Sequence, residues 1–198
     1  TNSIGVLVLA GPKSRELLNR VSKNGYNNEN FPWLTARNIA IGKIPINAMR
    51  VNYVGELGWE LHHPIEHQNQ IFDELFKVGK SFDLKPFGIR AMDSMRLEKS
   101  YRMIGTELSI EYSGFESAMD RFIQLDKGDF LGRDALLKTK EEGIRYKLVT
   151  LEVMDVNDAD ALGNNAVTLH DKLVGRATGG GFGFRINKSL ALAMIEME

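Results

Sequence analysis

The sequence IGVLVLAGPKSRELLNRVSKNG, residues 4–25, joins an uninterrupted apolar run to a segment with helical periodicity. The run from Ile4 to Ala10 predicts a buried strand, which a Gly-Pro pair then breaks. Leu17, Leu18 and Val21 give the next segment one apolar face, which predicts an amphipathic helix. A strand followed at once by a helix indicates a mixed architecture of strands and helices for this part of the chain.

The region that follows the first helix predicts mostly strands. In it, Met49, Val51 and Tyr53 alternate with polar or small residues and are predicted to share one face of a strand. Two amphipathic helices are predicted next, one within residues 65–84 and one from Ile89 to about Lys99. The N-terminal part is therefore predicted to be α+β.

The pattern changes near Gly143. From there to the C-terminus, short apolar runs alternate with glycine turns and one polar loop, which is typical of a meander of strands. We therefore predict an α+β domain over residues 1–142 and an all-β domain over residues 143–198.

Composition excludes several classes of protein. The chain has 198 residues and a net charge of −1, so it lacks the basic surplus that holds nucleic acid. It has no cysteine, which excludes disulfides, thiolate metal sites and a cysteine nucleophile. No apolar run is long enough to span a membrane. Because strand-like runs lie close to both ends, we expect the chain to be a piece of a longer protein.

Two motifs have structural interpretations. His62, His63 and His67 are expected to be solvated surface residues, since no carboxylate completes a ligand pattern, and no metal site is predicted. The stretch GGGFGF, residues 179–184, lacks the glycine spacing and the lysine of a phosphate-binding loop. We expect it to form a β-turn or a bulge with positive φ angles.

The stretch VNYVGELGWEL, residues 51–61, carries an acid between two glycines. The carboxylate of Glu56 suits a planar group with two adjacent N–H donors, such as a guanidinium or the 2-aminopyrimidinone edge of a pterin. Tyr53 and Trp59 would then enclose a flat ring. In the alternative interpretation, Glu56 is an exposed hairpin acid and the aromatic residues belong to the core. Periodicity does not distinguish between these two interpretations.

Five segments of the chain, in order, resemble the aminomethyltransferase (glycine cleavage T-protein) family. NYVGELGWEL resembles the family signature GYTGE-x-GFE, and LAGPKSRELL resembles its QGP-x-AR-x-LL segment. GIRAMDSMRLEKSYRMIGTEL is similar to the corresponding segment of dimethylglycine and sarcosine dehydrogenases. RFIQLDKGDFLGRDALL and LVGRATGGGFGFRINKSLALAMI also have counterparts. The chain thus resembles the C-terminal folate-binding region of those dehydrogenases most closely.

The resemblance implies a fold and a chemistry. The expected fold is the later portion of the folate-binding domain, followed by part of a small C-terminal β-barrel. The expected function is to bind tetrahydrofolate, which accepts a one-carbon unit from dimethylglycine or sarcosine and becomes 5,10-methylenetetrahydrofolate. FAD is expected only in an oxidoreductase domain of the parent protein, outside this chain.

The resemblance also implies site residues. Glu56 matches the family's pterin-binding glutamate, Tyr53 is expected to line the folate cavity, and Tyr101 and Arg90 are expected to contact folate. T-proteins have an arginine at the position of Met92, whereas here the nearest arginine is Arg90, two positions earlier, as in the dehydrogenases. No catalytic residue is predicted, because the family's catalytic aspartate lies in an IDDL segment that this chain lacks.

Two rival functions remain open. The parent protein could be a glycine cleavage T-protein, or a folate-binding scaffold of the same fold without catalysis. We expect a cytoplasmic protein, or one of the mitochondrial matrix if the source is eukaryotic, without nucleic-acid or membrane partners.

Overall fold

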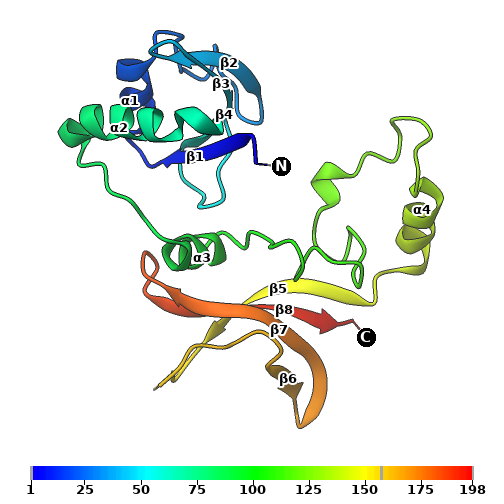
Figure 1. The fold of residues 1–198 in the computed structure, drawn as a ribbon. Helices are drawn as coiled ribbons and strands as arrows, with labels where there is room; N and C mark the ends of the chain where they lie inside the picture. Colours follow the sequence, from blue (N-terminus) through cyan, green and yellow to red (C-terminus); the bar gives the residue numbers. More distant parts are fainter. Residues whose placement is uncertain (1, 157, 198) are drawn as a thin grey trace. The chain divides into compact units, whose positions relative to one another are not determined.

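The computed structural model describes residues 2–156 and 158–197, which form two compact units, Thr1–Met92 and Asp93–Glu198 (Figure 1). Each unit contains one four-stranded antiparallel sheet. The mixed architecture predicted for the chain is therefore confirmed, with helices and strands in both units.

The first unit is built on a sheet of strand order β1-β4-β3-β2. The elements of this unit are β1 Ile4–Ala10, α1 Ser14–Val21, β2 Ala36–Ile41, β3 Ile44–Met49, β4 Gly58–Pro64, η1 Ile65–His67, α2 Gln68–Gly79 and η2 Lys80–Phe82. Helices α1 and α2 bury their apolar faces against one side of the sheet, as Figure 1 shows. The strand and helix predicted from residues 4–25 are thus confirmed, as is the helix predicted within residues 65–84.

An aromatic cluster lies in the core of this unit. Trp59 on β4 is fully buried, and its ring meets Tyr26 and Phe31 edge-on at centroid distances of 5.9 and 6.1 Å. The guanidinium groups of Arg15 and Arg50 lie 6.0 and 5.8 Å from the Trp59 ring, within reach of a cation–π interaction. Trp59 is therefore a core residue, as one of the two interpretations of the sequence expected.

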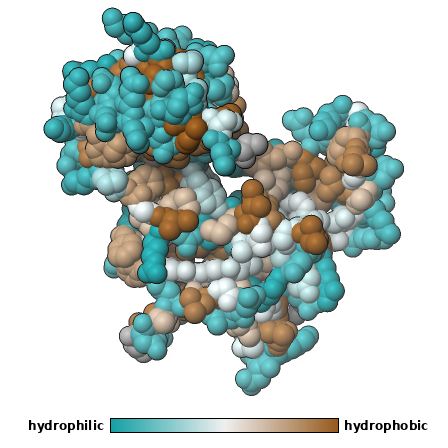
Figure 2. Space-filling view, viewed as in Figure 1, coloured by the Kyte–Doolittle hydropathy of each residue, from teal (hydrophilic) through white to brown (hydrophobic). Residues whose placement is uncertain are grey.

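Strand β1 is buried on one face only, which corrects in part the prediction of a buried strand. Leu7 and Leu9 pack toward the helices, whereas Ile4, Val6 and Val8 are 60, 44 and 46% exposed. The reason is that β1 is an edge strand of an antiparallel sheet, which has helices on one side only. In Figure 2, hydrophilic residues nevertheless cover most of the visible surface of the first unit.

The predicted alternation of Met49, Val51 and Tyr53 on a strand is wrong. Strand β3 ends at Met49, and residues 50–57 form an irregular turn before β4 begins. The alternating pattern in this stretch is therefore no evidence for a strand, because side-chain hydrogen bonds hold the backbone in another conformation.

The second unit is built on a sheet of strand order β5-β8-β7-β6. Its elements are η3 Asp120–Phe122, α4 Arg133–Glu142, β5 Tyr146–Val153, β6 Ala166–Leu169, β7 Lys172–Gly183 and β8 Lys188–Glu196, and helix α3, Ile89–Leu97, ends within it. Leu97 of α3 packs with Leu148, Leu192 and Met194 on one face of the sheet. The opposite face is covered near Gly180 by residues 161–165, where the backbone of Asn164 and Asn165 bonds to Ala177.

The glycines of β7 permit close packing on both faces of the sheet. A Cβ on Gly181 would lie 3.3 Å from Leu97 of α3, and one on Gly179 would lie 3.5 Å from the Arg96 guanidinium. A Cβ on Gly180 would collide with the carbonyl oxygen of Ala161 on the other face. The turn or bulge predicted for residues 179–184 is wrong: β7 continues through Gly183 in register with β8, and no positive φ angle occurs in this stretch. The register shift of β7 lies just before it, between Ala177 and Gly179. Glycine is needed at these positions because a side chain would not fit, not because the backbone adopts an unusual conformation.

Two predictions about domain organisation stay open. Among the described residues no strand pairing joins β6 to β5, so the sheet is not closed, and the small β-barrel stays a prediction. The compact units divide after Met92, whereas the sequence predicts a domain boundary near Gly143. Residues 93–119 belong to the second unit because a buried polar network ties them to β7. The boundary near Gly143 concerns the family's domains and stays a prediction.

No helix in the described part of the chain is long and apolar enough to cross a membrane.

Replacing Gly180 by alanine is expected to destabilise the chain by about 2–3 kcal/mol, because overpacking a filled site costs this much. The added methyl group would meet the carbonyl oxygens of Ala161 and Leu190, and Leu190 is held in register by its pairing with Gly181. Urea denaturation measures the difference in the free energy of unfolding. Gly88→Ala is the matched control, since nothing lies within 4 Å of its added Cβ. Equal stabilities of the two variants would contradict this account.

Candidate functional site

The turn between β3 and β4 carries the acid predicted to bind a ligand, and one asparagine holds this turn together. The Oδ1 atom of Asn52 accepts hydrogen bonds from the backbone N–H groups of Val54, at 3.0 Å, and of Glu56, at 3.2 Å. The Nδ2 atom of Asn52 donates to the carbonyl oxygen of Glu56. A single side chain therefore binds both backbone polar groups of Glu56.

Both glycines of the signature have structural roles in this turn. Gly55 has a φ of +71°, which a residue with a side chain rarely adopts. Gly58 begins β4, and a Cβ there would lie 2.8 Å from the carbonyl oxygen of Leu9. Gly58 thus allows β1 and β4 to approach closely, and Gly55 allows the chain to turn just before Glu56.

The two ends of the turn are fixed to the core of the first unit. Arg50 exchanges backbone hydrogen bonds with Leu34 and Thr35, and its side chain donates to the carbonyl oxygen of Phe31 at 2.6 Å. At the other end, the carbonyl oxygen of Leu57 accepts hydrogen bonds from Gly11 N–H and from the Ser14 hydroxyl. Glu56 is therefore presented from a short segment anchored on both sides.

A cavity of about 450 Å³ lies beside this turn, within the first unit. Most of its wall is apolar, contributed by β1, by α2 and by the extended segment 84–89. The cavity has the size of a small-molecule site. Tyr53 and Val54 lie in the wall of this cavity, but Glu56 does not. The cavity and the carboxylate are therefore neighbouring features of one turn, not one enclosed site.

The start of α3 borders the same cavity. Ile89 and Met92 contribute to its wall, whereas Arg90 is exposed and does not. Lys85 and Glu60 are the basic and acidic side chains among the described lining residues. Both have polar partners, since Lys85 lies 3.1 Å from Asp83 and Glu60 lies 3.1 Å from His62. The position that holds arginine in T-proteins thus contributes an apolar methionine here.

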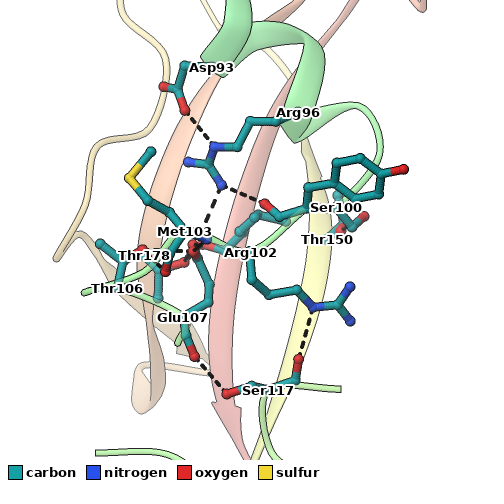
Figure 3. A network of polar contacts seen from close by, with 12 residues as sticks. Asp93, Arg96, Ser100, Arg102, Met103, Thr106, Glu107, Ser117, Thr150 and Thr178 are labelled. Carbon is teal, nitrogen blue, oxygen red and sulfur yellow. Dashed lines mark hydrogen bonds and ion pairs between the residues drawn. The ribbon is translucent and has the colours of Figure 1, made fainter. Parts of the chain in front are cut away.

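Tyr101, the fourth predicted folate contact, lies in the second unit just after α3. Its backbone is held by a buried arginine, because Arg96 Nη1 donates to the Tyr101 carbonyl oxygen at 2.8 Å. Arg96 Nε donates to Asp93 at 2.6 Å within the same helix. Figure 3 shows this guanidinium at the centre of a polar network that extends to Glu107.

Glu107 is the most buried carboxylate described, with no exposed surface. Its Oε2 atom accepts hydrogen bonds from Met103 N–H at 2.8 Å and from the Thr106 hydroxyl at 2.7 Å, and it lies 3.8 Å from Arg96 Nη1. The Thr178 hydroxyl on β7 donates to the other oxygen (Figure 3). Burial alone would raise the pKa of Glu107, but these hydrogen bonds outweigh it and lower the pKa below its usual value of 4.5.

Hydrogen bonds to backbone carbonyls extend this network along the chain. The Ser117 hydroxyl donates to the Glu107 carbonyl at 2.6 Å, and Arg102 donates to the carbonyls of Ser117 and Ala118 at 2.9 and 2.8 Å. Burial is the main cause that lowers the pKa of Arg102, with a smaller effect from Arg121. The irregular segment that carries Tyr101 is therefore fixed by charged and hydroxyl side chains.

The expectation of solvated histidines is wrong for His63. This residue is 2% exposed, because β4 turns Trp59, Leu61 and His63 toward the helices. Its Nδ1 atom lies 2.8 Å from the Leu61 carbonyl oxygen. His62 points to the opposite face, where it pairs with Glu60. Among residues 2–156 and 158–197, no three histidine, cysteine, aspartate or glutamate side chains cluster in a way that could hold a metal ion.

Sequence reasoning missed the residues that organise the site. Asn52 stands where the family signature has glycine, and that departure was the one available signal. Glu107 and Arg96 occur within the segment similar to the dehydrogenases, but nothing in their spacing predicts an ion pair between residues eleven positions apart. Thr178 is 71 residues from Glu107, so only the fold brings them together.

The comparisons with known proteins place the chain in a family. A model of the GCVT N-terminal domain matches residues 1–127, and the chain therefore belongs to the aminomethyltransferase (glycine cleavage T-protein) family. This confirms the resemblance seen in the sequence.

Particular relatives match the whole chain. Human mitochondrial dimethylglycine dehydrogenase is 34% identical over 100% of this chain and 23% of its own length. An aminomethyltransferase of Thermoanaerobacter sp. (strain X514) is 33% identical over 100% of this chain and 53% of its own length. The crystal structure of the glycine cleavage system aminomethyltransferase T from Bartonella henselae matches with a TM-score of 0.81 at 22% identity, over 98% of this chain and 52% of that one. The chain thus shares this fold and spans about half the length of the aminomethyltransferases it matches.

Replacing Glu107 by glutamine is expected to lower the free energy of unfolding by about 2 kcal/mol at neutral pH, since the variant weakens buried hydrogen bonds and leaves Arg96 with less counter-charge. Because the folded-state pKa of Glu107 lies below 4.5, its carboxylate stabilises the wild type above that pH. This contribution is lost as the pH falls through the folded-state pKa. The loss of stability with acid should therefore be less steep in Glu107→Gln.

Denaturant unfolding at a series of pH values measures both effects. Glu142→Gln is the control, because that carboxylate is exposed and pairs with Lys138 on the surface of α4. If Glu107→Gln and Glu142→Gln gave the same stability and the same pH dependence, the buried network would not have the role described.

Proposed function

We propose that the chain is the tetrahydrofolate-binding module of an FAD-linked dehydrogenase that acts on dimethylglycine or sarcosine. The match to dimethylglycine dehydrogenase over the full length of the chain carries this proposal. Mouse mitochondrial sarcosine dehydrogenase, 32% identical over 98% of the chain, gives further support. Since the chain covers less than a quarter of either relative, the flavin chemistry belongs to the remainder of the parent protein.

The turn around Glu56 supplies the interaction that recognises the pterin ring. The carboxylate accepts two parallel hydrogen bonds from the 2-aminopyrimidinone edge, the geometry in which carboxylates bind most strongly. Tyr53 lies in the wall of the adjacent cavity and offers a flat aromatic surface to the ligand. Tyr101 and Arg90 are assigned to further folate contacts by their positions in the family motif.

One observation of the structure supports the binding of tetrahydrofolate at this turn. Asn52 binds the backbone N–H and carbonyl of Glu56, so the backbone from which the carboxylate extends is held in place. Tetrahydrofolate supplies the nitrogen that accepts the one-carbon unit, and the protein supplies binding, orientation and exclusion of water. This chain contributes no catalytic residue in the proposal.

A glycine cleavage T-protein is the second candidate, favoured by the similar identity of the bacterial aminomethyltransferases. Met92 argues against this candidate, because T-proteins have arginine at that position. The two candidates also differ in the one-carbon donor, which in T-proteins is an aminomethyl-lipoyl arm. Oxidation of dimethylglycine by the parent protein would support the first candidate, and transfer that depends on a lipoyl protein would support the second. A non-catalytic folate-binding scaffold would show neither activity.

The proposed partners are folate, the amine-derived one-carbon donor and an FAD-containing domain of the same parent chain. Several relatives carry the word mitochondrial in their names. A mitochondrial matrix location is therefore proposed if the source is eukaryotic, and a cytoplasmic one otherwise.

Replacing Glu56 by glutamine or alanine is expected to weaken the binding of 5-formyltetrahydrofolate about 100-fold, since a bidentate charge-assisted pair contributes about 3 kcal/mol. Isothermal titration calorimetry of the wild type and variants measures the change in Kd. The thermal midpoint should stay unchanged, because the Glu56 backbone bonds to Asn52 rather than to its own side chain.

Glu66→Gln provides the matched control, since it removes an exposed carboxylate of the same unit outside the turn. Its Kd should equal that of the wild type. Absence of saturable binding by the wild type, or an unchanged Kd in Glu56→Ala, would contradict the proposal.

A further inference from the structure

The turn that carries Glu56 has few hydrogen bonds between its own backbone groups. Within residues 50–57, the backbone bonds given by the structure anchor Arg50 and Leu57 to neighbouring elements and join Val51 to Met49. Between these anchors, the described hydrogen bonds of Val54 and of the Glu56 backbone go to the Asn52 side chain. The conformation of the turn therefore depends on this amide.

The three bonds to Asn52 determine the direction of the Glu56 side chain. The amide oxygen binds Glu56 N–H and the amide nitrogen binds Glu56 C=O, so one planar group holds the backbone on both sides of the Glu56 Cα. The direction of a Cα–Cβ bond follows from the positions of these backbone atoms. Fixing them reduces the set of positions that the carboxylate can occupy.

From this geometry we infer that Asn52 is a positioning residue for Glu56, which acts on ligand affinity through the carboxylate rather than by touching the ligand. The inference rests on the proposed function, because it concerns the recognition of a pterin-like donor edge by Glu56. Preorganisation of this kind raises affinity by removing the entropy cost of ordering the side chain on binding.

The chemistry of asparagine suits this role. Asparagine offers an acceptor and a donor on one rigid plane, and the turn uses both. Aspartate would keep the two accepted bonds and lose the donated one. Glycine, which the family signature has at this position, would supply neither, so the signature turn must be held by other contacts. The stabilisation of the turn by Asn52 is thus a feature of this chain and not of the family signature.

The test is a double-mutant cycle on the affinity for 5-formyltetrahydrofolate, measured by calorimetry on the whole chain. Asn52→Ala is expected to weaken binding about 10-fold, and Asn52→Asp about 3-fold because it keeps the acceptor. In a Glu56→Gln background, Asn52→Ala should change the Kd by less than about 2-fold, since the group that it positions has lost its charge.

A structural role alone would not produce this coupling. Asn47→Ala is the matched control, because Asn47 is an exposed asparagine of the same unit whose amide donates to Asn38 at 3.0 Å. Its Kd should equal that of the wild type. An unchanged Kd in Asn52→Ala would overturn the inference, and so would a 10-fold loss that persists in the Glu56→Gln background.

Hydrogen exchange of the turn amides separates this inference from the proposed function. In Asn52→Ala, the amides of Val54 and Glu56 should exchange at least about 10-fold faster, while the Arg50 amide, which bonds to Thr35, should not change. If the wild type bound no folate, the proposed function would be wrong. The exchange rates would still test whether Asn52 holds the backbone of the turn. Unchanged exchange at Val54 and Glu56 would overturn this role. If the alanine variant does not fold, Asn52→Asp tests the donated bond alone, and a Kd unchanged from the wild type would then overturn the inference.

Discussion

The second unit depends on one buried ion pair. Glu107 has no exposed surface and Arg96 is almost completely buried, so both charges have lost their hydration. Such a pair is tolerated only when further hydrogen bonds satisfy the remaining donors and acceptors. Here Met103, Thr106 and Thr178 do so for the carboxylate, and Asp93 and the Tyr101 carbonyl do so for the guanidinium. Because these partners lie on α3, on the following loop and on β7, the pair fixes three parts of the unit at once.

In the first unit, too, polar side chains hold an irregular segment in place. Its turn between β3 and β4 is irregular and is held by the amide of Asn52, as the loop after α3 is held by Arg96 and Glu107. Both segments carry residues that the family motif assigns to folate, Glu56 in one and Tyr101 in the other. Loops with binding residues need a rigid support, and in this chain polar side chains provide it where strands and helices do not.

The regular elements of the fold could be predicted from sequence, because hydrophobic periodicity reports them directly. Strand β1 and helices α1, α2 and α3 lie close to their predicted ranges. Periodicity failed at Val51 and Tyr53, where side-chain hydrogen bonds outweigh the strand pattern. It also failed at His63, since a polar residue on the inward face of a strand looks like a surface residue when the direction of the face is unknown.

The candidate site was predictable only in part, for a physical reason. Glu56 and Tyr53 belong to a local signature that can be recognised from ten residues. The partners of Glu107 are up to 71 residues away in sequence, and contacts of that range are decided by how the sheet packs on α3. Residues that hold a site in place are therefore harder to find from sequence than residues that belong to its motif.

The glycines of β7 have a consequence for how substitutions spread through such a protein over evolutionary time. Gly180 admits no side chain because the Ala161 carbonyl lies against it, although neither residue belongs to the candidate site. Sequence variants that keep this packing will keep the glycine, so the position will look invariant without any ligand to explain it. A search for functional residues by invariance alone would therefore rank Gly180 beside Glu56.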